Sequence, residues 1–180
     1  RQRVLGCIPS ISAQLAATTA AIAAARDPAT GMLFQVVAAD GLPLDEPKGS
    51  GSFLTAWFLH RAAPDLAQDL YTASRDTLGG SLMGMLAMRE YVPGTPGTGG
   101  VDSGPLIFGY SVSATGFALG AATALGDAPT RDALLRTAQL GGSLAVGMTP
   151  GLASPSGEGA TGSHLGDAIL LAMLTSEGMP

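Results

Sequence analysis

A repeated helical hairpin is the feature that most constrains what this chain folds into. Residues 52–82 read as a helix, a tight turn with an aspartate, a second helix and then Gly-Gly-Ser-Leu. Residues 114–144 follow the same order and end in the same four residues. The start of the first copy, Gly-Ser-Phe-Leu at 51–54, is echoed by Gly-Ser-His-Leu at 162–165. The repeat predicts a helical hairpin of about fifty to sixty residues that occurs about three times.

Apolar spacing and the positions of glycine and proline predict mostly helical structure. The predicted helices cover residues 11–26, 52–61, 64–78, 127–140 and 163–176, and a further one runs from residue 111 or 113 to 125. A weaker helix is expected over residues 82–88, and a short strand over 32–37. Tight and long linkers alternate, which puts the long ones at the same end of a stack of hairpins. These long linkers cover residues 27–51, 79–110 and 141–162.

The composition fits closely packed helices in one domain. Hydrophobic residues make up 46% of the 180 residues and charged residues 13%, about half the usual share of charge. This balance excludes intrinsic disorder, which needs low hydrophobicity and high charge. The net charge is -5 and the basic residues are scattered, so nucleic-acid binding is not expected. We expect a single all-α domain over residues 1–180, complete in itself or half of a longer protein.

One stretch, residues 103–126, carries no charged residue and is long enough to cross a bilayer. Its glycines, serines, threonines and Pro105 favour a buried helix, so no transmembrane segment is expected. The chain has one cysteine, Cys7, which excludes an intrachain disulfide and fits either redox compartment. No signal peptide is recognised, and the location stays open between the cytoplasm, the periplasm and the extracellular space.

The repeat predicts apolar helices on the inside and helices with arginines and acids on the outside. This arrangement resembles the α/α toroid, the six-hairpin barrel of many glycan-acting enzymes and of linalool dehydratase-isomerase-like proteins. Asp-Ser-Gly-Pro at 102–105, followed by Ser-Ala-Thr-Gly-Phe at 113–117, resembles an element found in uncharacterised members of this barrel class. The resemblance covers most of the chain. With only about three hairpins, the chain is expected to form part of such a toroid, with its long loops at one end.

The long loops around the mouth of such a barrel are where catalytic residues are expected. Asp102 lies in a glycine-rich loop before the charge-free stretch, where an acid can serve as general acid or base. The alternative is that Asp102 has a structural role, as a turn residue or as a helix cap. Glu90 is the expected partner, because two acids across a sugar hydrolyse a glycosidic bond; the alternative is a surface ion pair. His164 is the third candidate, oriented by Asp167 three residues later, or else a histidine of the core.

Further residues of these loops and inner helices are candidates for substrate binding. Arg89 suits a carboxylate or phosphate group, and Tyr110 and Trp57 can stack on a sugar ring, although single aromatic residues more often belong to a core. Tyr91 and Asp167 complete this set. The spacings of histidine, aspartate and glutamate match no ligand motif, and no phosphate or dinucleotide loop is present, so neither a metal nor a cofactor is expected.

Three functions agree with these observations. The first is a carbohydrate-active enzyme, a glycoside hydrolase or lyase that uses paired carboxylates on a small-molecule or glycan substrate. The second is a non-catalytic interaction or scaffold domain of a larger envelope assembly, acting through association with that assembly or with further copies of itself. The third is a dehydratase or isomerase for an apolar, terpenoid-like alcohol, because the chain is rich in alanine and glycine and poor in aromatic residues.

Overall fold

The computed structural model describes residues 2–99, 103, 106–148, 171–172 and 175. These residues form five helices and two antiparallel sheets of two strands each. The helices are α1 (Gln2–Ala24), α2 (Gly49–Leu59), α3 (Pro64–Leu78), α4 (Val112–Ala124) and α5 (Ala128–Met148). The strands are β1 (Gly79–Leu82), β2 (Met85–Met88), β3 (Leu106–Ile107) and β4 (Tyr110–Ser111). The described part of the chain is therefore mostly helical, as predicted, with small sheets that an all-α fold does not contain.

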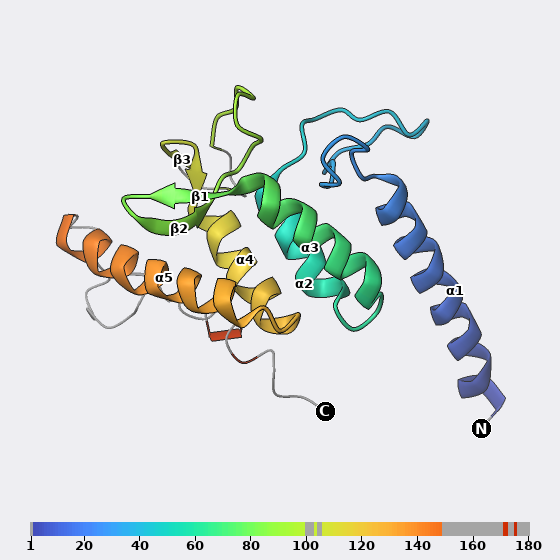
Figure 1. The fold of residues 1–180 in the computed structure, drawn as a ribbon. Coiled ribbons are helices and arrows are strands. Elements are labelled where there is room, and N and C mark those ends of the chain that lie inside the picture. Colours follow the sequence, from blue (N-terminus) through green and yellow to red (C-terminus); the bar gives the residue numbers. More distant parts are fainter. Residues whose placement is uncertain (1, 100–102, 104–105, 149–170, 173–174, 176–180) are drawn as a thin grey trace.

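Helices α2 and α4 pack against each other at the centre of the molecule, and neither contains a charged residue (Figure 1). Phe53 and Ala56 of α2 share one buried core with Ala114 and Ala118 of α4. Small side chains at a helix contact allow the two backbones to approach closely. Helix α3 covers α2, and α5 covers α4. The predicted order of apolar inner helices and charged outer helices is confirmed for these four helices.

The boundaries of α3 follow from its terminal residues. Pro64 occupies the first turn together with Asp65, and Arg75 lies in the last turn, so the charges complement the helix dipole. The helix ends at Leu78, as predicted. Its inner face buries Tyr71, whose ring meets that of Phe53 edge-on at 6.2 Å between centroids.

The two Gly-Gly-Ser-Leu segments adopt different structures. The first, residues 79–82, ends α3 and forms strand β1, whereas the second, residues 141–144, continues α5 without a break. The predicted end of a helix at residue 140 is therefore wrong. Strand β1 has a partner in β2, with Gly79 opposite Met88 and Leu82 opposite Met85. Tertiary pairing rather than local sequence thus sets the conformation of this motif.

Two further predictions of local structure are wrong. The weak helix expected over residues 82–88 is instead the turn and second strand of the β1–β2 hairpin. The strand expected over residues 32–37 is absent from the named strands of the described residues. Leu33 and Val37 form only isolated bridges, with Arg26 and Pro43. A short apolar run can form either a helix or a strand, so the segments that it packs against in the folded chain determine its secondary structure.

The long linkers and the tight turns lie at opposite ends of the hairpins. The start of α2, the end of α3 and the start of α4 meet beside the β-hairpins, while the α2–α3 and α4–α5 turns lie at the other end (Figure 1). The third long linker, 141–162, begins inside α5 and otherwise lies largely outside the described residues. The described residues form a row of helices rather than a closed ring, and α1 stands apart from the other four (Figure 1). None of the helices described combines the length and hydropathy needed to cross a bilayer.

Candidate functional site

The candidate site lies where α2 and α4 begin, around Glu90. The amide of Gly49 donates to the Glu90 carbonyl at 2.8 Å, and the amide of Glu90 donates to the Gly109 carbonyl at 3.2 Å. Glu90 thereby joins the first turn of α2 to the turn of the β3–β4 hairpin. The ends of the first two long linkers meet at this residue, as the hairpin stack predicts.

The side chain of Glu90 is fully buried, with 0% of the residue exposed. Ser50, itself 2% exposed, donates its hydroxyl to Oε1 at 2.6 Å, within the range of strong hydroxyl–carboxylate bonds. The other oxygen, Oε2, has no hydrogen-bond partner among the described residues. A buried polar atom without a partner costs about 1–3 kcal/mol, so such atoms call for an explanation and often belong to binding or catalytic groups.

Ser50 is a site residue that the sequence analysis missed. It follows Gly49, where an added Cβ would lie 2.5 Å from the carbonyl oxygen of Arg89. Only glycine lets the start of α2 approach the end of β2 closely enough for the Ser50–Glu90 bond to form. The run Gly-Ser-Gly-Ser at 49–52, directly before an apolar helix, was the sequence signal for this close approach.

Arg89 and Tyr110 form a stacked pair beside Glu90. The Arg89 guanidinium lies 4.3 Å from the centre of the Tyr110 ring, and its Nη2 donates to the tyrosine hydroxyl at 3.1 Å. That hydroxyl donates to the carbonyl of Ser81 at 3.2 Å. Arg89 and Tyr110 also form a β-bridge, which links the β1–β2 hairpin to the β3–β4 hairpin. The two expected binding residues are therefore brought together next to Glu90, and their contacts join the hairpins.

The other aromatic candidates lie elsewhere. Tyr91 follows Glu90, and its hydroxyl donates to the carbonyl of Thr98 at 3.3 Å. Trp57 is partly buried against the core and lies next to Phe58, 5.1 Å between ring centroids, in the second half of α2. Trp57 lies seven positions after Ser50 in the helix, about 10 Å along the axis. Trp57 is thus nearer to the tight turns than to Glu90.

Three candidates, Asp102, His164 and Asp167, lie outside the described residues. The neighbour of the first, Ser103, is 3% exposed and accepts a hydrogen bond on its carbonyl from the Ser111 hydroxyl at 3.1 Å. The same hydroxyl oxygen accepts from the Ala114 amide at 3.0 Å and so caps α4. The residue after Asp102 is therefore fixed at the first turn of α4, while the expected roles of Asp102, His164 and Asp167 stay predictions.

A second charged cluster lies at the opposite end, around Asp127. Its Oδ2 accepts from the Tyr71 hydroxyl and from Arg75 Nη1, each at 2.8 Å, and its Oδ1 accepts from the Thr130 amide at 3.1 Å. Burial raises the pKa of Asp127, but the hydrogen bonds from Tyr71, Thr130 and Arg75 outweigh it and lower the pKa to about 2. Burial and the bond to Asp127 raise the pKa of Tyr71. This cluster caps α5 and ties it to α3.

Comparisons with known proteins assign neither a family nor a function to the chain. No family model matches the chain, and no curated protein or solved structure matches it. Among the residues described, no group of three or more histidine, cysteine, aspartate or glutamate side chains is placed to hold a metal ion. The groups that the described residues place around Glu90 are its buried carboxylate, with one oxygen that has no partner among them, a serine hydroxyl, and a nearby arginine stacked on a tyrosine.

Proposed function

We propose that the end of the molecule around Glu90 is an acid–base site and that the chain is a carbohydrate-active enzyme, a glycoside hydrolase or lyase. The observation that carries the proposal is Oε2 of Glu90, a fully buried carboxylate oxygen for which the described part of the chain offers no hydrogen-bond donor. A substrate hydroxyl donates to this oxygen when the carboxyl group is ionised, and the protonated group donates to a glycosidic oxygen. Ser50 holds the other carboxylate oxygen and so orients the group.

The proposal assigns the second carboxylate to Asp102. Glycoside hydrolysis needs two acids on opposite sides of the bond that breaks. Asp102 precedes Ser103, which is buried at the first turn of α4. His164 supports the pair, and Arg89, Tyr91, Tyr110, Trp57 and Asp167 are proposed to contact the substrate. We further propose that the hairpins belong to a longer α/α toroid whose other hairpins complete the walls of the site.

Burial of Glu90 sets a condition on this mechanism. A substrate reaches the carboxylate only when the residues that cover it rearrange, because none of its surface is exposed. The proposal therefore includes a change of structure on substrate binding. Hydrogen exchange at the amides of Gly49 and Glu90, which close this end of the molecule, is expected to change when a substrate binds.

The test is turnover of a panel of oligosaccharides and polyuronides by the wild type and by Glu90→Gln and Asp102→Asn. Loss of one catalytic acid is expected to lower turnover by about 100-fold or more while circular dichroism and the unfolding midpoint change little. Glu46→Gln is the matched control, since Glu46 is an exposed acid of the first long linker. Wild-type turnover by either site variant contradicts the acid–base assignment, and absence of turnover by the wild type on every sugar contradicts the substrate class.

A second candidate function is an interaction or scaffold domain. The exposure of large apolar side chains favours it, including Ile11 at 62%, Phe58 at 67% and Phe108 at 78%. Exposed apolar surface of this kind often marks a contact with another protein. Under this alternative, Glu90 is a structural residue, and Glu90→Gln changes stability without changing any activity.

A further inference from the structure

Buried polar atoms without a partner gather at the start of α2. Among the described residues, four buried side-chain atoms have no hydrogen-bond partner: Nε2 of Gln35, Oδ2 of Asp45, Oγ of Ser74 and Oε2 of Glu90. Ser74 lies within α3, whereas the other three belong to segments that meet at the first turn of α2. Buried polar groups in folded proteins are nearly always paired, so each exception needs a physical reason. The acid–base site accounts for Glu90 but not for Gln35 or Asp45.

Two glycines of α2 make room for these side chains. An added Cβ at Gly49 would meet the carbonyl of Arg89, next to Glu90, and one at Gly51 would overlap the side-chain amide of Gln35. Glycine is less favourable than alanine in a helix, because its backbone loses more conformational freedom on folding. The first turn of α2 thus loses helix stability at two positions, and each of them brings a residue with an unpartnered buried atom against the helix.

Asp45 holds the segment that carries Gln35. Its Oδ1 accepts from the backbone amides of Gln35 at 3.2 Å and of Val36 at 3.1 Å. Its Oδ2 forms an ion pair with Lys48 Nζ at 3.4 Å but no hydrogen bond. Solvent reaches 15% of the Asp45 side chain, and the loop over residues 36–44 is mostly exposed. A carboxylate and a carboxamide therefore lie together at the base of a surface loop, each with one atom left for a ligand.

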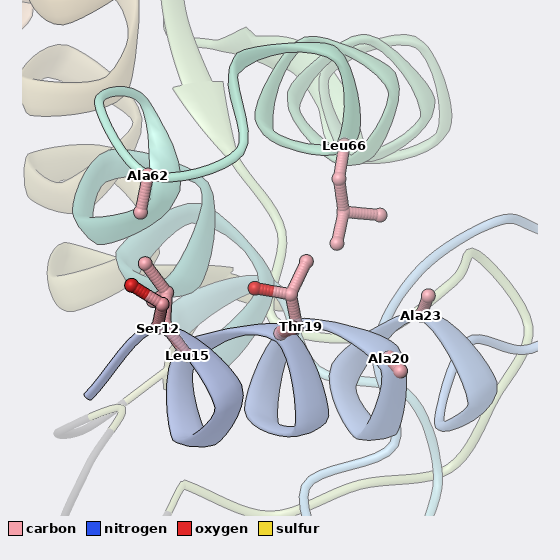
Figure 2. A pocket seen from close by; sticks show the side chains of 8 residues that line it. Ser12, Leu15, Thr19, Ala20, Ala23, Ala62 and Leu66 are labelled. Atoms are coloured by element: carbon pink, nitrogen blue, oxygen red, sulfur yellow. The ribbon is translucent and has the colours of Figure 1, made fainter. Parts of the chain in front are cut away.

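A groove at the other end of α2 lacks such atoms. It lies between α1 and the α2–α3 turn and encloses about 560 Å³. Uncharged side chains line it, with Ser12, Leu15 and Thr19 on the α1 side and Ala62 and Leu66 opposite (Figure 2). None of the four unpartnered atoms belongs to its lining residues, so the polar groups that call for a ligand lie at the start of α2 instead.

The chemistry of the two atoms selects the class of ligand. Nε2 of Gln35 only donates hydrogen bonds, and a carboxylate oxygen of Asp45 only accepts them. An anion would pair with Gln35 but would meet a second negative charge at Asp45. A cation would pair with Asp45, but it would meet the ammonium group of Lys48 and would leave Gln35 without an acceptor. A hydroxyl group both donates and accepts, so two neighbouring hydroxyl groups satisfy both atoms without adding charge.

We propose that Gln35 and Asp45 form a sugar-binding subsite. Gln35 donates to one hydroxyl group of a neutral ring, and Asp45 accepts from the neighbouring hydroxyl group. The subsite deepens the proposed function and rests on it for the choice of a sugar. Ser50, which holds Glu90, and Gly51, which faces Gln35, are adjacent in α2. One ring of an oligosaccharide is therefore held beside the turn at which another ring meets Glu90, and such remote contacts position the bond that breaks.

The test is calorimetric titration of the full chain with maltohexaose, cellohexaose, mannohexaose and xylohexaose. Gln35→Met keeps the length of the side chain but removes the donor, and it is expected to raise Kd about five- to tenfold. The same change is expected to leave the unfolding midpoint equal or higher, because it removes a buried donor that has no partner. Asp45→Asn keeps an oxygen for the two backbone amides and is expected to raise Kd at least about tenfold, since hydrogen bonds to charged groups are stronger.

Two matched controls separate the subsite from general effects of these substitutions. Gln68→Met changes an exposed glutamine of α3, whose Nε2 donates to the Thr72 hydroxyl at 3.1 Å. Asp40→Asn changes an exposed aspartate of the same linker, whose Oδ1 accepts from the Leu42 amide at 3.1 Å. Both controls are expected to bind the sugar within about twofold of the wild type.

Turnover measured in parallel distinguishes failure of the subsite from failure of the acid–base proposal. A sugar that the wild type binds, and whose Kd neither Gln35→Met nor Asp45→Asn changes, overturns the subsite and assigns the two atoms to water. So does a lower unfolding midpoint of Gln35→Met at unchanged Kd, which gives Gln35 a structural role. Binding that both variants weaken, without turnover by the wild type, supports the subsite and contradicts the acid–base proposal. Absence of binding to every sugar overturns both.

Discussion

Replacing Asp127 with asparagine tests the cluster that ties α5 to α3. Asparagine keeps a side-chain oxygen for the Thr130 amide, so α5 keeps its cap. The change removes the negative charge that the Tyr71 hydroxyl and Arg75 Nη1 each approach at 2.8 Å. The variant therefore isolates the electrostatic part of the contact between the two outer helices.

The expected magnitude follows from the pKa of the carboxyl group. The cluster lowers the pKa of Asp127 from its ordinary value of 3.8 to about 2. At about 1.36 kcal/mol per tenfold change in proton affinity, this corresponds to about 2.4 kcal/mol at neutral pH. Solvent reaches 18% of the Asp127 side chain and 34% of the Arg75 side chain and screens part of the interaction. We expect Asp127→Asn to lower the free energy of unfolding by about 1–2 kcal/mol.

The effect has a defined dependence on pH. Because the pKa of Asp127 is lower in the folded chain than its ordinary value, the ionised carboxylate stabilises the fold above pH 3.8. This stabilisation is lost as the pH falls towards 2, and about half of it remains at pH 3. The difference between wild type and Asp127→Asn is thus largest at neutral pH and shrinks in acid.

Urea unfolding followed by circular dichroism at pH 3, 5 and 7 measures this difference. Asp132→Asn is the control, because Asp132 also pairs with an arginine, Arg131 at 3.0 Å, but its side chain is 53% exposed. The control is expected to change the free energy of unfolding by less than about 0.5 kcal/mol. Equal stability of Asp127→Asn and wild type at pH 7, or the same difference at pH 3 and 7, refutes the reasoning.

Three further changes test the core, the close approach at the site and a strained turn. Phe53→Ala is expected to lower the free energy of unfolding by about 3–5 kcal/mol, because Phe53 is fully buried; a loss under 1 kcal/mol in urea unfolding contradicts this. Gly49→Ala is expected to cost about 1–3 kcal/mol and to disrupt the Ser50–Glu90 bond, since its Cβ meets the Arg89 carbonyl, and a wild-type unfolding midpoint speaks against that contact. Phe108→Asn is expected to stabilise by about 0.5–1 kcal/mol, because Phe108 has φ +52 and is 78% exposed in a turn that prefers asparagine; thermal unfolding below the wild-type midpoint rejects this assignment.

The candidate site was only partly accessible to sequence reasoning. Glu90 and Arg89 were found as charged residues on a long linker, and the hairpin stack correctly placed that linker beside the start of α2. Ser50 was missed because its role depends on a hydrogen bond across 40 positions of sequence. Trp57 was proposed on residue type alone, and the rise of α2 carries it away from Glu90.

The amino-acid sequence by itself determined the helices whose limits are local. Pro64 and the glycines after Leu78 bound α3 at the predicted residues, and the uncharged composition of α2 and α4 placed them in the centre. Only the tertiary structure determined the conformation of the two Gly-Gly-Ser-Leu segments. Residues 79–82 form a strand because β2 is available to pair with them, whereas residues 141–144 are helical within α5. The same holds for the burial of Glu90 and the exposure of α1. The physical reason is that propensities and caps act within a few residues, whereas strand pairing and burial depend on groups that only folding brings together.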